Sequence, residues 1–211
     1  MKGIVKDTLI IFLITLFAGG ILGFVYELTK TPIEVQKLEK QAAACAEVFK
    51  EADANGELKE VESLTFEQVA VDEEVLAEVA ANCDIKATVN EVYEAKTSTG
   101  VVYGNVISVT TKEGYGGDIR FYMGVTKDGK LKGISILEIH ETPGLGMRAS
   151  EVLVPQFRDV AGPEFTVTKS GKTSDTQIDA ITSATITSKA VTRGVNFGMA
   201  YANALAKGGN E

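Results

Sequence analysis

The chain has 211 residues, and its 29 acidic and 21 basic side chains give a formal net charge of −8. This length suits one domain of ordinary size with an anchoring segment, and not two large domains. The acidic balance excludes the basic surface of a nucleic-acid-binding protein, so we expect no nucleic acid as a partner. One histidine, two cysteines and no Cys-x-x-Cys spacing predict that the chain has no metal site.

The first predicted element is an uncharged run from Thr8 to Tyr26. As a helix this run would span about 28 Å, close to the hydrocarbon thickness of a bilayer. Lys2 and Lys6 precede it, as in a cleaved signal peptide, but the apolar stretch exceeds the roughly 7–15 residues of a signal core. The sequence therefore predicts an uncleaved transmembrane helix over 8–26, after a short N-terminal segment over 1–7.

The orientation of this helix follows less directly from the sequence. The lysines and arginines near its two ends are almost balanced in number, so the positive-inside rule does not decide between the two orientations. A short N-terminal segment makes insertion with the N-terminus inside the easier route. We therefore predict a single-pass protein of the cytoplasmic membrane, with its N-terminus inside and the bulk of the chain on the extracytoplasmic side.

Residues 27–84 are predicted to form a helical juxtamembrane and acidic region. Pro32 fits the first turn of a new helix, because proline is tolerated there. The apolar residues of this helix recur at spacings of three and four: Val35, Leu38, Ala42, Cys45 and Phe49. The helix would end before the turn dipeptide Asn55-Gly56, and the following acidic stretch, helical around 72–81, would form a solvated face. Cys45 is expected to be buried, and whether it pairs with Cys83 stays open.

From Ile85 onward the pattern changes to that of β-strands. Segments rich in β-branched and aromatic residues cover 87–93, 101–110, 118–126 and 130–139. Asp128-Gly129 between the last two segments predicts a hairpin, and consecutive hairpins make a sheet mainly antiparallel. We predict an α+β fold: a transmembrane helix, the region over 27–84, and a domain over 85–211 with a mainly antiparallel sheet flanked by helices.

Two glycine-containing loops flank the predicted hairpin. Gly114-Tyr115-Gly116-Gly117 allows a tight turn or a close approach to a ligand, and no Gly-Lys-Ser/Thr follows that would make it a P-loop. Pro143-Gly144 predicts a type II turn that would hold Thr142 and Leu145 beside a flat ligand. A helix is predicted over 149–160, directly after this turn.

A cluster of hydroxyl side chains, Asp179 to Ser188, leads into an apolar segment whose spacing predicts a helix. Its apolar positions are Val191, Val195, Gly198, Ala202 and Leu205. Thr187 or Ser188 is the predicted N-cap, which places Thr185 just ahead of the helix. Unpaired amides and the positive end of the helix dipole meet there, so the position suits a phosphate.

The run Asp179-x-x-Thr182-Ser183-Ala184-Thr185 resembles the flavinylation motif Asp-x-x-(Ser/Thr)-Gly-Ala-Thr of FMN-binding domains. Such domains occur in the G subunit of Rnf electron-transport complexes and in the C subunit of Na+-translocating NADH:quinone reductases. In that family a dedicated flavin transferase attaches FMN to the last threonine through a phosphoester bond. The resemblance implies covalent attachment at Thr185. Ser183 stands where the motif has glycine, which carries a cost if the position needs a positive φ.

A second part of the resemblance lies upstream. The sequence Glu141-Thr-Pro-Gly-Leu-Gly146 recurs in the same family about forty residues before the attachment threonine, and the Gly-Tyr-Gly-Gly loop also has a counterpart there. By this analogy Glu141, Thr142 and Leu145 would line the isoalloxazine ring. Thr182, Ser183 and Ala184 would flank the phosphate, and Asp179 is the motif's first residue.

The resemblance implies a membrane-anchored electron carrier bearing covalent FMN, a subunit of an Rnf-type ferredoxin:NAD+ oxidoreductase that translocates Na+ or H+. Its partners would be the other subunits, the flavin transferase and the membrane. Without a triad around His140, the one histidine, we expect a redox subunit with no independent catalytic site. The alternatives are the C subunit of a Na+-translocating NADH:quinone reductase, a stand-alone tethered flavoprotein, and a pilin-like structural protein.

Overall fold

The computed structural model describes residues 2–52, 58–59 and 64–208. The chain divides into two units, residues 1–42 and residues 43–211. Helix α1 (Lys2–Glu47) accounts for the described part of the first unit and contributes its last residues to the second.

The apolar part of α1 is long enough to cross a bilayer. Residues 6–30 are strongly hydropathic, and none of this window is buried within the structure. Apolar side chains on every side of a helix are typical of a membrane span. The hydroxyls of Thr15 and Thr29 donate to backbone carbonyls one turn earlier, at 2.9 Å from Phe12 and Val25, so their polar groups are satisfied without water. The predicted span over 8–26 is therefore helical.

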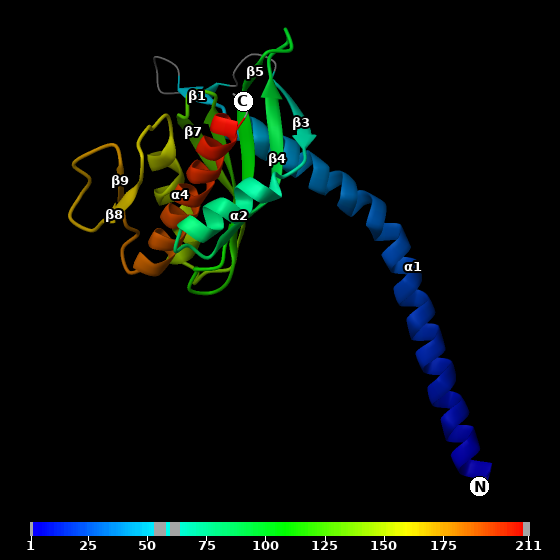
Figure 1. The fold of residues 1–211 in the computed structure, drawn as a ribbon. Coiled ribbons are helices and arrows are strands. Elements are labelled where there is room, and N and C mark those ends of the chain that lie inside the picture. Colours follow the sequence, from blue (N-terminus) through cyan, green and yellow to red (C-terminus); the bar gives the residue numbers. More distant parts are fainter. Residues whose placement is uncertain (1, 53–57, 60–63, 209–211) are drawn as a thin grey trace. The chain divides into compact units, whose positions relative to one another are not determined.

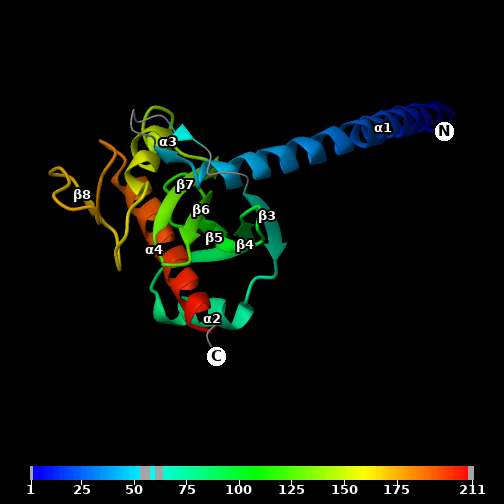
Figure 2. The same cartoon turned by 90° about the horizontal axis from the view of Figure 1, so that it is seen from above.

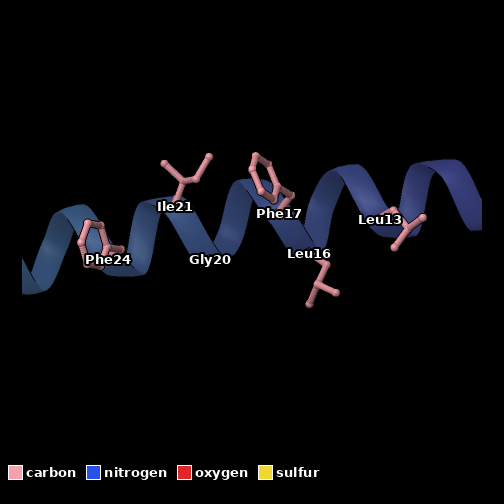
Figure 3. Close-up of a pocket in the computed structure, with 6 residues that line it drawn as sticks. All are labelled: Leu13, Leu16, Phe17, Gly20, Ile21 and Phe24. Atoms are coloured by element: carbon pink, nitrogen blue, oxygen red, sulfur yellow. The ribbon is translucent and has the colours of Figure 1, made fainter.

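Leucine, isoleucine and phenylalanine side chains surround Gly20 in the middle of this span. Figure 3 shows Phe17 and Ile21 projecting away from one side of the helix and Leu16 from the opposite side. Because Gly20 has no side chain, a shallow apolar notch remains between its neighbours.

One detail of α1 differs from the prediction. No new helix begins at Pro32, since α1 continues through it to Glu47. A proline in a helix interior removes one hydrogen bond, but it does not by itself end the helix. The helix was predicted to end before Asn55-Gly56, and α1 does end ahead of that dipeptide, at Glu47; the dipeptide itself lies outside the described residues.

The second unit is built on a five-stranded antiparallel sheet of order β3-β4-β5-β6-β7 (Figure 1). The strands are β3 (Thr65–Val69), β4 (Ala87–Lys96), β5 (Val102–Thr111), β6 (Ile119–Thr126) and β7 (Leu131–Ile139). The four predicted strands and the Asp128-Gly129 hairpin are confirmed, with Gly129 at φ +78°. The edge strand β3 was not predicted, and it precedes residue 85 together with α2 (Glu73–Asn82).

Helix α4 (Thr185–Gly208) covers one face of the sheet, and α2 packs against α4 (Figure 2). Gly194 and Gly198 bring α4 close to the strands, because a Cβ on Gly198 would lie 2.9 Å from a Val109 methyl and nearer still to the Met123 sulfur. Val191 and Val195 are fully buried in this core. The α+β class and the flanking helices agree with the prediction.

The last turn of α1 and the two residues after it cover part of the opposite face. Ala44, Cys45, Val48 and Phe49 are buried there against Ala95, Val106 and Tyr122. Burial, assisted by the carboxylate of Glu91, raises the pKa of the Cys45 thiol to about 12. Cys45 and Cys83 are both free thiols in this structure.

Short elements complete the unit. They are β1 (Glu51–Ala52), β2 (Leu58–Lys59), η1 (Gly146–Arg148), α3 (Ala149–Val152), η2 (Val154–Phe157), β8 (Thr166–Thr168) and β9 (Gln177–Asp179). The predicted helix over 149–160 is wrong in extent: the segment forms α3 and then the separate 3-10 helix η2, which begins at Val154, carries Pro155 in its first turn and ends at Phe157. The parallel pair β8–β9 was not predicted, since three-residue strands carry too little alternation to detect.

Candidate functional site

Three segments distant in sequence converge on one pocket of about 550 Å³. They are the loop between β5 and β6, the turn after β7 and the start of α4. The pocket is lined by Tyr115, Glu141, Thr142, Leu145, Gly146, Ser183, Ala184, Thr185, Ile186 and Thr187. Its volume lies within the range of about 300–1,000 Å³ that is usual for small-molecule and cofactor sites.

The wall made by α4 begins with a tight turn. The N–H of Ala184 donates to the carbonyl of Ile181 at 3.0 Å, and Ser183, the third residue of this turn, has φ +63°. A type II turn needs a positive φ at that position, which is why the motif carries glycine there. Ser183 therefore adopts a conformation that an L-residue enters at a cost.

Helix α4 begins at Thr185, a residue that the sequence had placed just ahead of the helix. The predicted N-cap at Thr187 or Ser188 is wrong, because both residues lie inside the first turn and are buried. The Ser188 hydroxyl instead accepts the N–H of Ile181 and donates to the carbonyl of Ala184, each at 2.9 Å. It stabilises the turn that precedes the helix.

This start leaves a polar end of α4 facing the pocket. Thr185, Ile186 and Thr187 are the first three helical residues, and all three line the pocket. Their backbone N–H groups have no hydrogen-bond acceptor within the helix, because no helical residue precedes them by one turn. Ala184, just before them, has no side-chain oxygen that could cap them. Unpaired amides and the positive dipole end together favour an anion at this position.

The opposite wall is organised by Glu141, which is 8% exposed. Its carboxylate oxygen Oε1 accepts the backbone N–H of Tyr115 at 2.7 Å. A Cβ on Gly116 would lie 2.1 Å from the carbonyl oxygen of His140, so this position has room for glycine alone. The Gly-Tyr-Gly-Gly loop is thus held tightly against the end of β7.

The turn after β7 has the predicted geometry. The N–H of Leu145 donates to the carbonyl of Thr142 at 3.1 Å, and Gly144 has φ +76°, so the type II turn is confirmed. Gly146 follows it, and a Cβ there would lie 2.7 Å from both Glu141 Cβ and Thr187 Oγ1. Gly146 therefore permits the contact between the Glu141 wall and the first turn of α4.

A salt bridge ties the β5–β6 loop to α4 from outside the pocket. Glu113 accepts a 2.7 Å hydrogen bond from Arg193 Nε and a 3.0 Å bond from the N–H of Lys86. Partial burial opposes ionisation of Glu113, but the bonds from Arg193 and Lys86 outweigh it and hold the pKa of this carboxyl below its usual value. Arg193 also donates to the carbonyl of Asp84.

The structure brings together six of the eight residues that the sequence nominated. Glu141, Thr142, Leu145, Ser183, Ala184 and Thr185 line the pocket. Asp179 and Thr182 do not line it. Asp179 ends β9, where its N–H and carbonyl bind the side-chain amide of Gln156 at 2.7 and 3.1 Å, and Thr182 is an exposed residue of the turn.

Four lining residues were missed: Tyr115, Gly146, Ile186 and Thr187. The glycine before Met147 and the aromatic residue between two glycines were visible signals, but their meaning depends on contacts between distant segments. His140 is largely exposed, and its Nε2 lies 3.9 Å from Glu138 Oε1.

Comparisons with known proteins match both parts of the chain. The FMN-binding domain family model matches residues 114–200, and that of the RnfG N-terminal region matches residues 1–48. Fold, pocket and match define an FMN-binding domain whose chain begins with an apolar helix. The G subunit of the Na+-translocating ferredoxin:NAD+ oxidoreductase complex of Acetobacterium woodii is 35% identical over 211 residues, which cover 98% of this chain and 95% of that one.

The chain therefore belongs to the G-subunit family of ion-translocating oxidoreductase (Rnf) complexes. Another relative, the G subunit of the proton-translocating ferredoxin:NAD+ oxidoreductase complex of Clostridium ljungdahlii, is 49% identical over 84 residues, 39% of this chain and 45% of that one. Among solved structures, that of Shewanella oneidensis NqrC aligns with a TM-score of 0.45 at 20% identity, covering 55% of this chain and 61% of that chain.

Proposed function

We propose that this protein is a membrane-anchored electron-carrier subunit that holds FMN in the pocket at the start of α4. It would relay electrons within an ion-translocating ferredoxin:NAD+ oxidoreductase complex, as the names of its relatives indicate for them. The observation that carries the proposal is the pocket itself. A helix N-terminus suited to a phosphate and walls suited to a flat ring open into the same space.

Different residues of the pocket would bind the phosphate and the ring of FMN. The amides of the first turn of α4 would hold the phosphate, while Leu145, Ile186 and Tyr115 supply apolar and aromatic surface for the ring. FMN supplies the electron-transfer chemistry when it is bound, and the protein contributes attachment, orientation and electrostatics. We assign no independent catalytic site to this chain.

We further propose that the attachment is covalent, through a phosphoester at Thr185. This threonine is half-buried in the pocket wall, and its hydroxyl makes no hydrogen bond within the described residues. Its place at the start of α4 puts it beside the amides that favour a phosphate. A flavin transferase would form the bond. Ser183 and Ala184 would flank the phosphate, whereas Asp179 and Thr182 would position the turn.

The membrane anchor supports a further part of the proposal. An apolar N-terminal helix and membership of this family indicate a membrane-anchored protein. We propose a single pass with the N-terminus in the cytoplasm and the FMN domain on the extracytoplasmic side. A covalent tether suits that location, because dissociated FMN would be lost there. Family membership also removes the pilin-like alternative.

The test is flavin retention under denaturing conditions. The full-length protein is expressed with a flavin transferase, purified in detergent and run on an SDS gel under ultraviolet light. We expect a fluorescent band for the wild type and none for Thr185→Ala. Thr185→Ser, which restores a hydroxyl, and Thr173→Ala, at an exposed threonine of the β8–β9 loop, should both keep fluorescence. A fluorescent Thr185→Ala band would reject the attachment site.

A further inference from the structure

Tyr115 differs from the other tyrosines of the domain in its surroundings. Those four place their hydroxyls against a polar partner: Tyr93 and Tyr122 against Glu91, Tyr103 against Glu51, and Tyr201 against the N–H of Asp72. The Tyr115 hydroxyl makes no hydrogen bond in the part of the chain that the structure describes. Its side chain is 70% exposed, although it lines the pocket.

The backbone that carries this ring is nevertheless fixed. Its N–H is held by Glu141 at 2.7 Å, and the residue two places earlier, Glu113, is bound to Arg193 of α4. Added Cβ atoms on the neighbouring residues Gly114 and Gly116 would each lie 2.1 Å from a backbone oxygen, so the loop backbone packs closely against itself and against the end of β7. An exposed aromatic ring therefore stands at the pocket on a rigid support.

The rim of the pocket is also apolar beyond Tyr115. Leu145, Met147 and Ile186 are 37%, 44% and 53% exposed, and the first and last of these line the pocket with Tyr115. Large apolar side chains that gather at the mouth of one pocket indicate a surface that a ligand covers. Leu145 and Ile186 come from the turn after β7 and from α4, whereas Tyr115 comes from the β5–β6 loop.

We propose that Tyr115 is a positioning residue whose ring stacks against the isoalloxazine of FMN and closes the pocket to water. The inference rests on the proposed occupation of this pocket by FMN. Aromatic faces stack favourably in offset arrangements, and the three-ring flavin offers a face wide enough to hold the tyrosine ring. Glu141 acts through its bond to the Tyr115 backbone, so it sets the position of the stacking ring as well as lining the pocket.

The test measures the bound flavin by its light emission. Full-length protein carrying covalent FMN is prepared as wild type, Tyr115→Phe and Tyr115→Ala, and fluorescence is expressed per flavin. A phenol in contact with an excited flavin quenches it by donating an electron, which returns afterwards. We expect a several-fold rise in both variants, because each lacks the phenol. Quenching by iodide should increase in Tyr115→Ala alone, since phenylalanine still covers the ring.

The outcomes are separable. Unchanged fluorescence in both variants would overturn the assignment of Tyr115, and so would equal iodide access in Tyr115→Ala and the wild type. If Tyr115→Ala fails to take up flavin, Tyr115→Phe alone tests the proposal: a rise in its fluorescence per flavin supports stacking by Tyr115, and unchanged fluorescence overturns it. The proposed function is tested first, on the wild type alone. A wild-type protein that acquires no flavin in the presence of the transferase would overturn the proposed function and not the role of Tyr115.

Discussion

Replacement of Ser183 by glycine should stabilise the domain. Ser183 has φ +63°, and its side chain is exposed, so the substitution removes backbone strain without removing buried contacts. A non-glycine residue in the left-handed region costs about 1–2 kcal/mol. Glycine gives back about 0.5–1 kcal/mol of this through its greater freedom in the unfolded chain. With both terms near the middle of their ranges, the net expected gain is about 0.5–1 kcal/mol.

The assay is equilibrium or thermal unfolding of the full-length protein in detergent, before flavin attachment. In a domain of this size about 1 kcal/mol corresponds to about 2–4 °C in Tm, so Ser183→Gly should unfold roughly 1–4 °C higher. Thr182→Gly is the matched control, because Thr182 is the preceding exposed residue of the same turn and does not have a positive φ. It should lose stability. If Ser183→Gly lost as much stability as Thr182→Gly, strain at Ser183 would be refuted.

Three further perturbations test how the pocket is assembled. Gly146→Ala would place a Cβ 2.7 Å from Glu141 Cβ, so we expect a loss of about 1–3 kcal/mol in denaturant unfolding and reduced flavin incorporation. Glu141→Ala removes the acceptor of the Tyr115 N–H, so that amide should exchange with solvent faster, whereas Glu141→Gln, which keeps an acceptor oxygen, should preserve its protection. The lowered pKa of Glu113 means that its bond to Arg193 contributes stability above the ordinary carboxyl pKa and loses it as the pH falls through the lower folded value. Glu113→Gln should therefore show a shallower loss of stability at acid pH than the wild type, and equal slopes would contradict this reading.

The central strands and the hairpin were predictable because each has a strong local signal. β-Branched residues fill β4 to β7, and Asp128-Gly129 supplies the one backbone geometry that the hairpin requires. β3, β8 and β9 lack such signals, since they are short edge or two-stranded elements whose pairing depends on distant partners. The position of Pro32 was also ambiguous from local sequence, because proline favours the first turn of a helix and yet lies in the interior of α1.

Site residues that belong to a sequence motif could be predicted. Site residues whose role depends on a contact with a distant segment could not. The hydroxyls near Thr185 indicated a helix start, but the structure uses Ser188 to close the turn and begins the helix after Ala184. Gly146 is important because it lets its segment contact Thr187 of α4, and Tyr115 because its backbone binds Glu141; in each case the partner lies in a distant part of the sequence. Only folding brings these segments together, so spacing alone could not assign them.

The most direct test of covalent flavin attachment is mass spectrometry of the tryptic peptide 173–189, taken from the protein in its own membrane. Cleavage after Lys172 and Lys189 isolates this segment with Thr185 inside it. We predict a peptide heavier by the mass of FMN less one water, with fragmentation placing the addition on Thr185. A peptide recovered wholly unmodified, or one carrying the flavin on another hydroxyl, would contradict the account.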